Sequence, residues 1–315
     1  MWKYIDKDMT NEFLLSLFSF EEKDSKKNLK LLYSISNNKE KNYKVFKIKK
    51  RNGKTRTIYE PNYILKKLQR QILENILNNK EISKYATAYK KGINLSCNAK
   101  VHLNKKIILK LDIKDFFNNI KFPLIYDACF PIEYFPKQVG FILTHLCTYD
   151  DFLPQGAPTS SYISNLVMKE FDYKIEKICE QKNISYTRYC DDMTFSGDFD
   201  YKEIIKLVRE NLYKLVLKLN NKKIKVITNS NKQLVTGIVV NKKLQTSKDY
   251  RKKLRQEIYY IKKYGIDNHL EKINLVSKDK YLKSLYGKVL YVLQINKNDN
   301  EFKLYKEFLK NKFNL

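Results

Sequence analysis

The sequence predicts an α+β fold that contains an antiparallel sheet. Runs of strand-forming residues come in pairs with turn signals between them, as antiparallel hairpins require. Amphipathic helical stretches separate these pairs without the strict alternation of a parallel sheet. From about residue 248 the chain is mostly helical. The three observations together favour α+β over a doubly wound parallel sheet.

The first elements expected are a hairpin and a helix. Residues 43–62, YKVFKIKKRNGKTRTIYEPN, contain two strand-forming runs around Asn52-Gly53, which is a strong hairpin signal, and the second run stops at Pro61. Asn62 can cap the helix that follows. That helix has an apolar stripe at three- to four-residue spacing, formed by Leu65, Leu68, Ile72 and Ile76.

The middle of the chain predicts a buried strand followed by helices. The strand lies within residues 105–117, KKIILKLDIKDFF, whose apolar density indicates burial on both faces. Helices are expected near 123–149, with breaks at Pro131 and Pro136. One helix is expected at 161–179, because its apolar residues share a single stripe.

The remaining elements alternate in type before the helical C-terminal region. A hairpin is expected at 186–196 and a helix near 201–219. Strands are expected around 224–228 and 234–240. Helices follow from 248.

The balance of charges predicts a polyanionic partner. The 315 residues carry a net charge of +28, spread along the chain rather than confined to a tail. A folded protein with such an excess attracts nucleic acid. The 24 Tyr and 17 Phe among these cations suit stacking on bases. The basic helices of 242–315 favour a region that grips a duplex through its phosphates.

The cysteines and the apolar content predict a cytoplasmic protein without membrane contact. Five scattered cysteines with no C-x-x-C pair indicate a reducing compartment and argue against zinc. There is no run of about 18 apolar residues, so no membrane span is expected. The first twenty residues show no secretory signal.

Three carboxylates stand among strand-forming residues. Asp191 and Asp192 are adjacent in RYCDDMTFSG, and Asp112 interrupts an apolar strand. Like charges kept close need a counter-charge or a raised pKa, and a divalent metal supplies the counter-charge. Mg²⁺ prefers a few carboxylates together with substrate phosphates. If the strand of Asp112 lies beside the hairpin, these residues can hold two Mg²⁺ ions about 4 Å apart for in-line phosphoryl displacement.

Several segments resemble reverse transcriptases in order and spacing. YCDD at 189–192 resembles the Y-x-D-D box of that family, LDIKDFF at 111–117 its first catalytic strand, and LPQGAPTSSYISNL at 153–166 its L-P-Q-G segment. Two further elements, NAKVH at 98–102 and VTGIVVN at 235–241, are similar to the N-A-x-x-H and V-T-G elements of retron-type bacterial reverse transcriptases.

The resemblance implies a right-hand polymerase architecture with fingers, palm and thumb. It implies an N-terminal region and fingers at 1–104, a palm at 105–241 with fingers elements around 123–165, and a helical thumb that binds an RNA/DNA duplex at 242–315. Because the chain ends soon after this thumb, no maturation or endonuclease domain is expected.

The resemblance also implies roles for individual residues. Asp112, Asp191 and Asp192 match the catalytic, metal-binding carboxylates, and the Ile113 carbonyl is a further candidate ligand. The dNTP-binding positions are Lys54, Arg56, Asp115, Phe116, Phe117 and Gln155, and Phe117 matches the gate that excludes a ribose 2′-hydroxyl. The RNA- and primer-binding positions are Asn98, His102, Val235, Thr236 and Gly237. Either Lys222 or Lys223 matches the basic residue that protonates pyrophosphate.

Some of these positions have a structural interpretation as well. Phe116 and Phe117 can belong to the core, and His102 can be an internal histidine with satisfied hydrogen bonds. Gly237 can permit close approach of the backbone to the primer or to a packed strand. Cys190, where many relatives carry alanine, adds a potential thiol sensitivity.

The function implied is an RNA-directed DNA polymerase of a retron. In that family the enzyme copies its cognate structured non-coding RNA, using dNTPs, into single-stranded DNA (msDNA) joined to the RNA at a guanosine 2′-hydroxyl. It usually acts with an effector protein in antiphage defence. The alternatives are another bacterial reverse transcriptase class, of diversity-generating, abortive-infection or group II intron type, and a non-catalytic RNA-binding module with the same fold.

Overall fold

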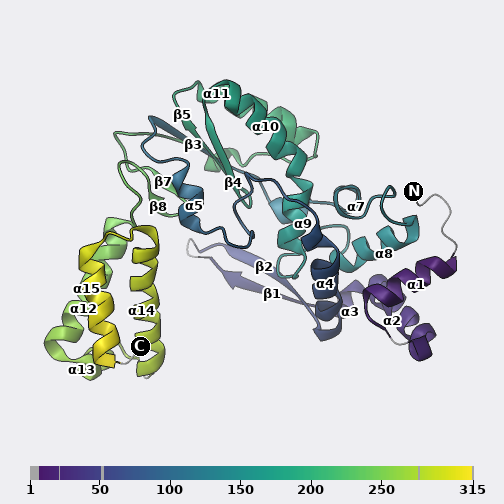
Figure 1. Ribbon diagram of the computed structural model, residues 1–315, viewed down its shortest axis with the longest axis horizontal. Helices are drawn as coiled ribbons and strands as arrows, with labels where there is room; N and C mark the ends of the chain where they lie inside the picture. The colour runs from purple at the N-terminus through teal and green to yellow at the C-terminus, as the bar shows by residue number, and fades with distance from the viewer. Residues whose placement is uncertain (1–6, 21, 51–52, 276, 314–315) are drawn as a thin grey trace.

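The structure is a computed structural model that describes residues 7–20, 22–50, 53–275 and 277–313. It is elongated, with the first helices at one end, a sheet near the centre and a bundle of C-terminal helices at the other end (Figure 1). Within the described ranges, no helix is long and apolar enough to cross a membrane.

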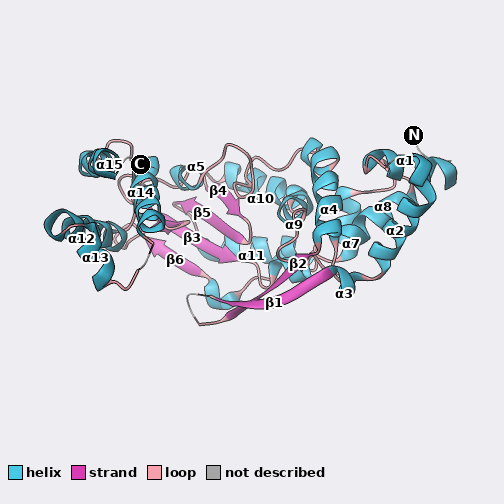
Figure 2. Ribbon diagram, turned by 90° about the horizontal axis from the view of Figure 1, so that it is seen from below, coloured by secondary structure: helices cyan, strands magenta, loops and turns pink. Residues whose placement is uncertain are grey.

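The first hairpin forms where the sequence predicts it. β1 (Tyr43–Lys49) and β2 (Thr55–Pro61) pair antiparallel along their whole length. Gly53 has a φ of +78°, which suits a turn, whereas Asn52 of the predicted turn lies outside the described residues. The hairpin forms a sheet of its own, apart from the central sheet (Figure 2), and most of its side chains are exposed.

The predicted antiparallel sheet is present. Its strands are β3 (Ile107–Asp112), β4 (Ser185–Tyr189), β5 (Asp192–Gly197) and β6 (Lys225–Thr228). They lie side by side in the order β4-β5-β3-β6, and each neighbouring pair is antiparallel (Figure 2). β3 therefore lies directly beside the hairpin of β4 and β5, as the predicted site requires.

The two faces of this sheet have different surroundings, because successive side chains of a strand point to opposite sides. α10 (Lys169–Gln181) and α11 (Tyr201–Tyr213) cover one face (Figure 1). On that side the main hydrophobic core takes in Leu109, Leu111, Met193 and Phe195. The other side carries Asp112 opposite Asp192, Lys110 opposite Thr194 and Ile108 opposite Ser196. We call it the open face because α10 and α11 do not cover it, although other segments bury Ile108 and Ser196.

Helices fill the N-terminal part and the segments between the strands. The N-terminal part contains α1 (Lys7–Leu17), η1 (Glu22–Asp24), α2 (Ser25–Asn37), α3 (Lys39–Asn42), α4 (Tyr63–Asn75) and η2 (Leu77–Asn79). Asn62 caps α4, as predicted, by accepting a hydrogen bond from the Leu65 N–H at 2.9 Å. Between the strands lie α5 (Leu95–Lys100), α6 (Phe116–Asn119), α7 (Phe122–Cys129), α8 (Lys137–Cys147), α9 (Ser160–Val167) and η3 (Asn221–Lys223).

Two predicted helices are wrong in extent. The helix expected at 161–179 is two helices, α9 and α10, separated at Met168. Both bury the same apolar stripe, so periodicity alone does not reveal the break. The helix expected at 201–219 ends at Tyr213, where the chain turns back and the Leu217 N–H donates to the Leu212 carbonyl at 3.0 Å.

The strand expected at 234–240 is instead a tight hairpin. β7 (Leu234–Val235) and β8 (Ile238–Val239) pair antiparallel around Thr236 and Gly237. These two residues have φ values of +46° and +84°, and left-handed residues of this kind do not occur within a continuous strand. Two features conceal this turn in the sequence. Apolar residues flank it on both sides, and threonine is not a usual residue at a turn position.

The C-terminal region is a helical bundle, as predicted. It consists of α12 (Lys248–Tyr264), α13 (Ile266–Lys272), α14 (Lys278–Ile295) and α15 (Asn300–Phe313), and these helices share a hydrophobic core of their own. A smaller cluster connects the bundle to the sheet, and we call it the junction cluster. Its buried members are Ala99, Ile108, Val235, Ile238, Val240 and Ile295.

A fully buried ion pair ties β4 to the helices behind it. Arg188 of β4 and Asp172 of α10 are both 0% exposed. The guanidinium donates to the two carboxylate oxygens at 2.7 and 2.8 Å. The same guanidinium donates to the Asn165 side chain at 3.2 Å and to the Cys190 carbonyl at 3.0 Å. Because Cys190 immediately precedes Asp191, this pair connects α10 to the turn that carries the acidic residues.

Removing the negative partner of this pair should destabilise the fold. Asp172→Asn leaves the Arg188 charge buried without a counter-charge, and we expect a loss of about 3–5 kcal/mol in the free energy of unfolding, measured with urea. Glu203→Gln is the control, because it breaks an exposed pair with Lys182 and should cost less than about 1 kcal/mol. Equal losses in the two variants would contradict the proposed importance of the buried pair.

Candidate active site

The adjacent carboxylates Asp191 and Asp192 lie at a two-residue turn between β4 and β5. Tyr189 pairs with Asp192 across the hairpin, so that Cys190 and Asp191 form its tip. Cys190 has a φ of +61°, and positive φ at the first loop residue is a feature of the turns that join strands most closely. The tight turn fixes the direction of Asp191 relative to the sheet.

The strand pairing brings the third carboxylate to the same place. Asp112 lies directly opposite Asp192 in the β3–β5 pair, and both project from the open face. The N–H of Ile113 donates to the Asp191 carbonyl at 3.1 Å, which fastens the tip of the hairpin to the end of β3. The structure therefore brings together the three carboxylates that the sequence predicts as a site.

The electrostatics of this group call for a cation. Burial raises the pKa of Asp191, and the charge of Asp112 raises it further. Burial, followed by the charge of Asp191, raises the pKa of Asp192. Both carboxylates are thus destabilised in their ionised form, and a positive ion that they share would reverse this. All three side chains offer oxygen ligands, which suit Mg²⁺.

Lys223 is the cation closest to Asp112 in this structure. Its ammonium lies 2.5 Å from Asp112 Oδ2, and the Asn220 side chain donates to Asp112 Oδ1 at 3.2 Å. Burial alone would lower the pKa of Lys223, but the hydrogen bond to Asp112 and the three carboxylate charges raise it. Of the two lysines considered from the sequence, the structure brings Lys223 to the site. Among the described residues, no three His, Cys, Asp or Glu side chains already form a common metal cage.

The two phenylalanines after Asp112 separate into different environments. Phe116 is buried in the core, whereas Phe117 is half-buried and packs against Phe116 with ring centroids 5.5 Å apart. Asp115, exposed and with a φ of +46°, precedes the short helix that carries both rings. Phe117 is therefore the ring that can contact a nucleotide, and Phe116 supports it.

The L-P-Q-G segment docks on the first hairpin. The Tyr59 N–H of β2 donates to the Gln155 carbonyl at 2.8 Å. Gly156 follows with a φ of +122°, and a Cβ there would lie 2.8 Å from the Tyr59 carbonyl oxygen, so only glycine fits. Lys54 and Arg56 are exposed on the outer part of the same hairpin. This contact sets the hairpin that carries both cations relative to Gln155.

The N-A-x-x-H element is buried rather than placed on a nucleic-acid surface. Asn98 is 1% exposed and His102 is 0% exposed. The ring nitrogens of His102 lie 2.7 Å from the hydroxyls of Ser196 and Thr187, one on each strand of the acidic hairpin. With both nitrogens engaged inside the protein, neither side chain has a surface on which to bind RNA directly. This position corrects the expectation of a direct RNA contact.

The V-T-G element forms the tip of the β7–β8 hairpin. Val235 is buried in the junction cluster, Thr236 is half-buried and Gly237 is exposed. A Cβ on Gly237 would meet nothing within 4 Å, so the glycine is needed for its φ of +84° and not for close approach of another chain segment.

Cys190 is enclosed, which argues against the expected thiol sensitivity. Burial raises the pKa of its thiol to about 12, and the Tyr89 hydroxyl donates to its sulfur at 3.5 Å. A thiol with so little thiolate reacts slowly.

Sequence reasoning missed Tyr89 and Arg188 as neighbours of the acidic turn. For Arg188 a signal exists, since it is a charged residue inside a strand-forming run, as Asp112 is.

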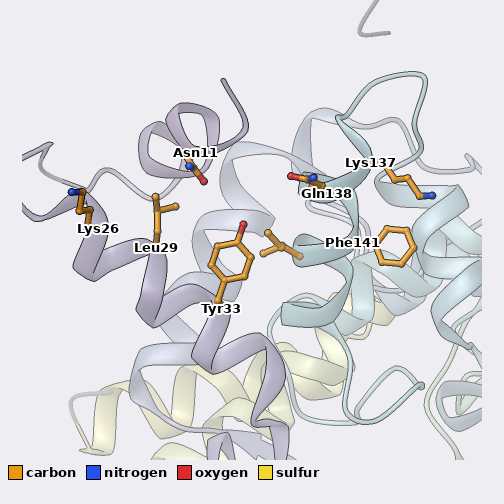
Figure 3. A pocket seen from close by; sticks show the side chains of 8 residues that line it. Asn11, Lys26, Leu29, Tyr33, Lys137, Gln138 and Phe141 are labelled. Atoms are coloured by element: carbon orange, nitrogen blue, oxygen red, sulfur yellow. The ribbon is translucent and has the colours of Figure 1, made fainter. Parts of the chain in front are cut away.

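A cavity elsewhere in the molecule lacks the chemistry of this site. It has a volume of ≈ 780 Å³ and lies between α1, α2 and α8, with Tyr33 and Phe141 among the side chains around it (Figure 3). The residues that line it are Asn11, Lys26, Leu29, Tyr33, Lys137, Gln138, Phe141 and Ile142. None is acidic, so the cavity offers no alternative to the three carboxylates as a metal site.

Comparisons with known proteins agree with this geometry. Residues 48–283 match the family described as reverse transcriptase (RNA-dependent DNA polymerase). The Retron Ec86 reverse transcriptase of Escherichia coli is 30% identical over 226 residues, which cover 70% of each chain. The Retron Ec83 reverse transcriptase of the same species is 33% identical over 214 residues, which cover 63% of this chain and 68% of that protein. A solved telomerase from Candida albicans, in complex with a fragment of telomeric RNA, is more distant. It aligns with 85% of this chain and 63% of its own at a TM-score of 0.49 and 10% identity.

The chain therefore belongs to the reverse transcriptase family, and it is an RNA-directed DNA polymerase with an RNA template as partner. It is of the retron type, as its N-A-x-x-H and V-T-G elements predict. The right-hand α+β architecture is confirmed, with the four-stranded antiparallel sheet as its palm. The assignments of the β1–β2 hairpin to the fingers and of α12–α15 to the thumb stay predictions. Reverse transcriptases generally use divalent metal ions. The boundaries predicted at 104/105 and 241/242 stay predictions.

The burial of His102 should make the fold sensitive to acid. Burial, helped by the charge of Lys105, lowers the pKa of His102 to about 3, whereas the unfolded chain protonates it near 6.5. The unfolded state therefore binds more protons between pH 6.5 and pH 3, and stability falls as the pH falls through that window. Between pH 7 and pH 5 we expect a loss of about 2 kcal/mol from this residue.

His102→Gln tests this by urea unfolding at pH 7 and pH 5. Glutamine keeps one donor and one acceptor but cannot be protonated, so the variant should lose about 2 kcal/mol less than the wild type over the interval. His145 and His269 are present in both proteins, so their contributions to the pH dependence of stability cancel in the comparison. Identical losses would mean that the ring of His102 titrates normally in the folded protein and is not enclosed.

Proposed function

We propose that this protein copies a cognate structured non-coding RNA into branched, RNA-linked single-stranded DNA, as retron reverse transcriptases do. The observation that carries the proposal is the convergence of Asp112, Asp191 and Asp192 on the open face of the palm, in a chain with the retron elements. We further propose that two Mg²⁺ ions serve the reaction.

The three carboxylates would hold the metals. Asp112 and Asp191 are the principal ligands in this proposal, with Asp192 and the Ile113 carbonyl beside them. The ions would lower the pKa of the attacking hydroxyl and stabilise the pyrophosphate that leaves. To bind a metal ion, the Asp112 carboxylate would release the Lys223 ammonium. The lysine can move away readily, because its side chain is 57% exposed.

Lys223 then supplies a proton where the reaction needs one. Its raised pKa keeps the ammonium charged at neutral pH, and its contact with Asp112 supports a position beside the reacting phosphates. A proton donated from Nζ to the departing pyrophosphate is general acid catalysis. Lys222 is exposed on the same 3-10 turn without that contact to Asp112.

The incoming dNTP would be held between the fingers and the palm. Lys54 and Arg56 bind its triphosphate from the fingers hairpin, and Gln155 contacts it near the sugar. Phe117 would lie at the base of this site, where its half-buried ring would leave no room for a 2′-hydroxyl. Asp115 and Phe116 position that ring from the preceding residues.

The partners proposed are the cognate RNA, its DNA product and a retron effector protein in antiphage defence. The basic helices of the thumb suit a duplex backbone, since phosphate contacts with lysine give strong, salt-dependent binding. The retron-type relatives support the proposal of a branched product. Sequencing of nucleic acid that copurifies with the protein would identify the RNA, and copurified RNA without covalently linked DNA would contradict msDNA synthesis.

Loss of the acidic pair should abolish synthesis without harming the fold. With a primed RNA template, dNTPs and Mg²⁺, we expect Asp191→Asn/Asp192→Asn to extend the primer at least about 10³-fold more slowly, because metal binding is worth several kcal/mol. Since both carboxylates have raised pKa values, the neutral variant should melt at the same or a higher temperature than the wild type.

Asp198→Asn is the control for this experiment. Asp198 is an exposed palm residue paired with Lys106, and its variant should extend the primer as the wild type does. EDTA should stop the wild type, and added Mg²⁺ should restore it. Unchanged extension by the double variant would exclude the two-metal proposal, whereas an inactive wild type would point to a non-catalytic RNA-binding module.

Substitution of the gate should relax the choice of sugar. Phe117→Ala opens space beside the sugar, and we expect the ratio of kcat/KM for rNTP to that for dNTP to rise about 10- to 100-fold, the range for one missing side-chain contact. Phe116→Leu is the comparison, because it alters the core ring that supports Phe117. It should lower stability and raise that ratio less than Phe117→Ala does. A larger change in Phe116→Leu than in Phe117→Ala would reverse the two roles.

A further inference from the structure

The residues that define the N-A-x-x-H element all face inward. Asn98, Ala99 and His102 are buried, whereas Lys100 and Val101 between them are exposed. Positions i, i+1 and i+4 of a helical turn lie on one side, so the spacing describes the inner side of α5 and of the turn that extends it. A motif made of inward-facing residues has a role inside the protein.

Each of the three inward residues contacts a different part of the active-site region. His102 bridges β4 and β5 through the hydroxyls of Thr187 and Ser196. Ala99, at 0% exposure, packs in the junction cluster that connects palm and thumb. Asn98 lies between these contacts and joins two loops that are far apart in the sequence.

Asn98 is the central member of a chain of hydrogen bonds that crosses the site. The Thr87 N–H donates to the Arg188 carbonyl of β4 at 2.8 Å. The Thr87 hydroxyl lies 2.9 Å from Asn98 Oδ1 and 3.1 Å from the same Arg188 carbonyl. The Asn98 amide then donates to the Thr236 hydroxyl at 3.3 Å.

The chain therefore runs from the strand that carries the acidic turn to the tip of the β7–β8 hairpin. Its first member, Arg188, also holds the Cys190 carbonyl next to Asp191. Its last member, Thr236, has a φ of +46° and sits beside the exposed Gly237. In the described part of the structure, Asn98 is the side chain that hydrogen-bonds to the Thr236 hydroxyl. The base of the same hairpin is held to the palm by Val235 and Ile238 in the junction cluster, so the Asn98 contact adds a restraint at its tip.

We propose that Asn98 is a positioning residue that sets the primer-side turn at Thr236–Gly237 relative to the catalytic hairpin. The N-A-x-x-H element is in this view an internal brace between β4–β5, β7–β8 and the thumb junction. Its effect on the reaction should not depend on the sequence of the primer–template. The inference rests on the proposed function and on the sequence-based expectation that this turn contacts the primer. Of the three residues expected there, Thr236 and Gly237 have exposed surface, whereas Val235 is buried.

The physical consequence is geometric. A primer terminus must lie within reacting distance of the incoming nucleotide, and a misplacement of about 1 Å can cost about 10²-fold in rate. A buried side-chain hydrogen bond with partners on both sides fixes such a distance better than an apolar contact, because its length and direction are restricted. Loss of Asn98 should therefore reduce the rate of the chemical step more than the affinity for either substrate.

The experiment is single-turnover primer extension with a homopolymer template and with the RNA that copurifies with the protein. For Asn98→Ala we expect the maximal extension rate to fall about 10- to 100-fold on both templates. The apparent Kd for dNTP should stay within about threefold of the wild-type value. A separate burst experiment with primer–template in excess gives the active fraction of each variant, so partial misfolding cannot imitate a slower rate.

Thr236→Ala provides a second route to the same contact, since Thr236 is half-buried and its truncation spares the core. It should slow extension to a similar degree, Thr236→Ser should lose less, and the double variant with Asn98→Ala should be no slower than the slower single variant, because both remove one interaction. Val101→Ala, an exposed change next to the brace, should leave the rate unchanged.

Three outcomes would overturn the inference. A rate unchanged in Asn98→Ala would show that the brace does not set the reacting distance. A loss confined to the copurified RNA would mean that Asn98 acts in RNA recognition. Independent, multiplicative losses in the double variant would separate Asn98 from Thr236. A wild type that fails to extend any primer would instead contradict the proposed function, so the two failures are distinguishable.

Discussion

The pairing of β3 with β5 is the constraint on which the rest of the structure depends. It sets Asp112 directly opposite Asp192, at a separation of Cα atoms of about 5 Å, and repulsion between the carboxylates opposes it. The covered face supplies the opposing force. Leu109, Leu111, Met193 and Phe195 are all buried there, and each contributes about 1.5–3 kcal/mol. The apolar side of the sheet thus holds together what its acidic side would separate.

Polar contacts on both faces give the acidic hairpin its exact register with the surrounding helices. Behind the sheet, Arg188 is paired with Asp172 and holds the carbonyl next to Asp191. On the open face, His102 bridges the two strands. Such buried polar networks add little net stability, because desolvation offsets much of the attraction, but they restrict geometry. An active site in which small displacements change the rate benefits more from restricted geometry than from additional stability.

The sequence was sufficient for the parts of the fold that follow simple periodicity. The Asn62 cap and the first hairpin follow from turn residues and apolar runs. The pairing of β3 with β5 was only a condition of the predicted carboxylate site, and the structure fulfils it. Apolar pattern could not distinguish a strand from the hairpin at Thr236–Gly237, because only backbone dihedrals separate them. For His102 the sequence left an internal role and an RNA contact open, and for Asn98 it suggested only an RNA contact. Tertiary packing decides between these roles, and it turns both side chains inward.

The contrast between rigid and movable charges explains how this site can accept a cation. Asp112 and Asp192 are fixed by strand pairing and Asp191 by the turn, so the carboxylates cannot separate to relieve their repulsion. Lys223 stands on a short 3-10 turn with more than half of its side chain exposed, and it can leave Asp112 by rotation of its own bonds. An arriving divalent ion therefore competes with one flexible ammonium and disturbs no part of the sheet. Because the lysine stays tethered nearby, its positive charge would remain available to the phosphates of the substrate, as the proposed function requires.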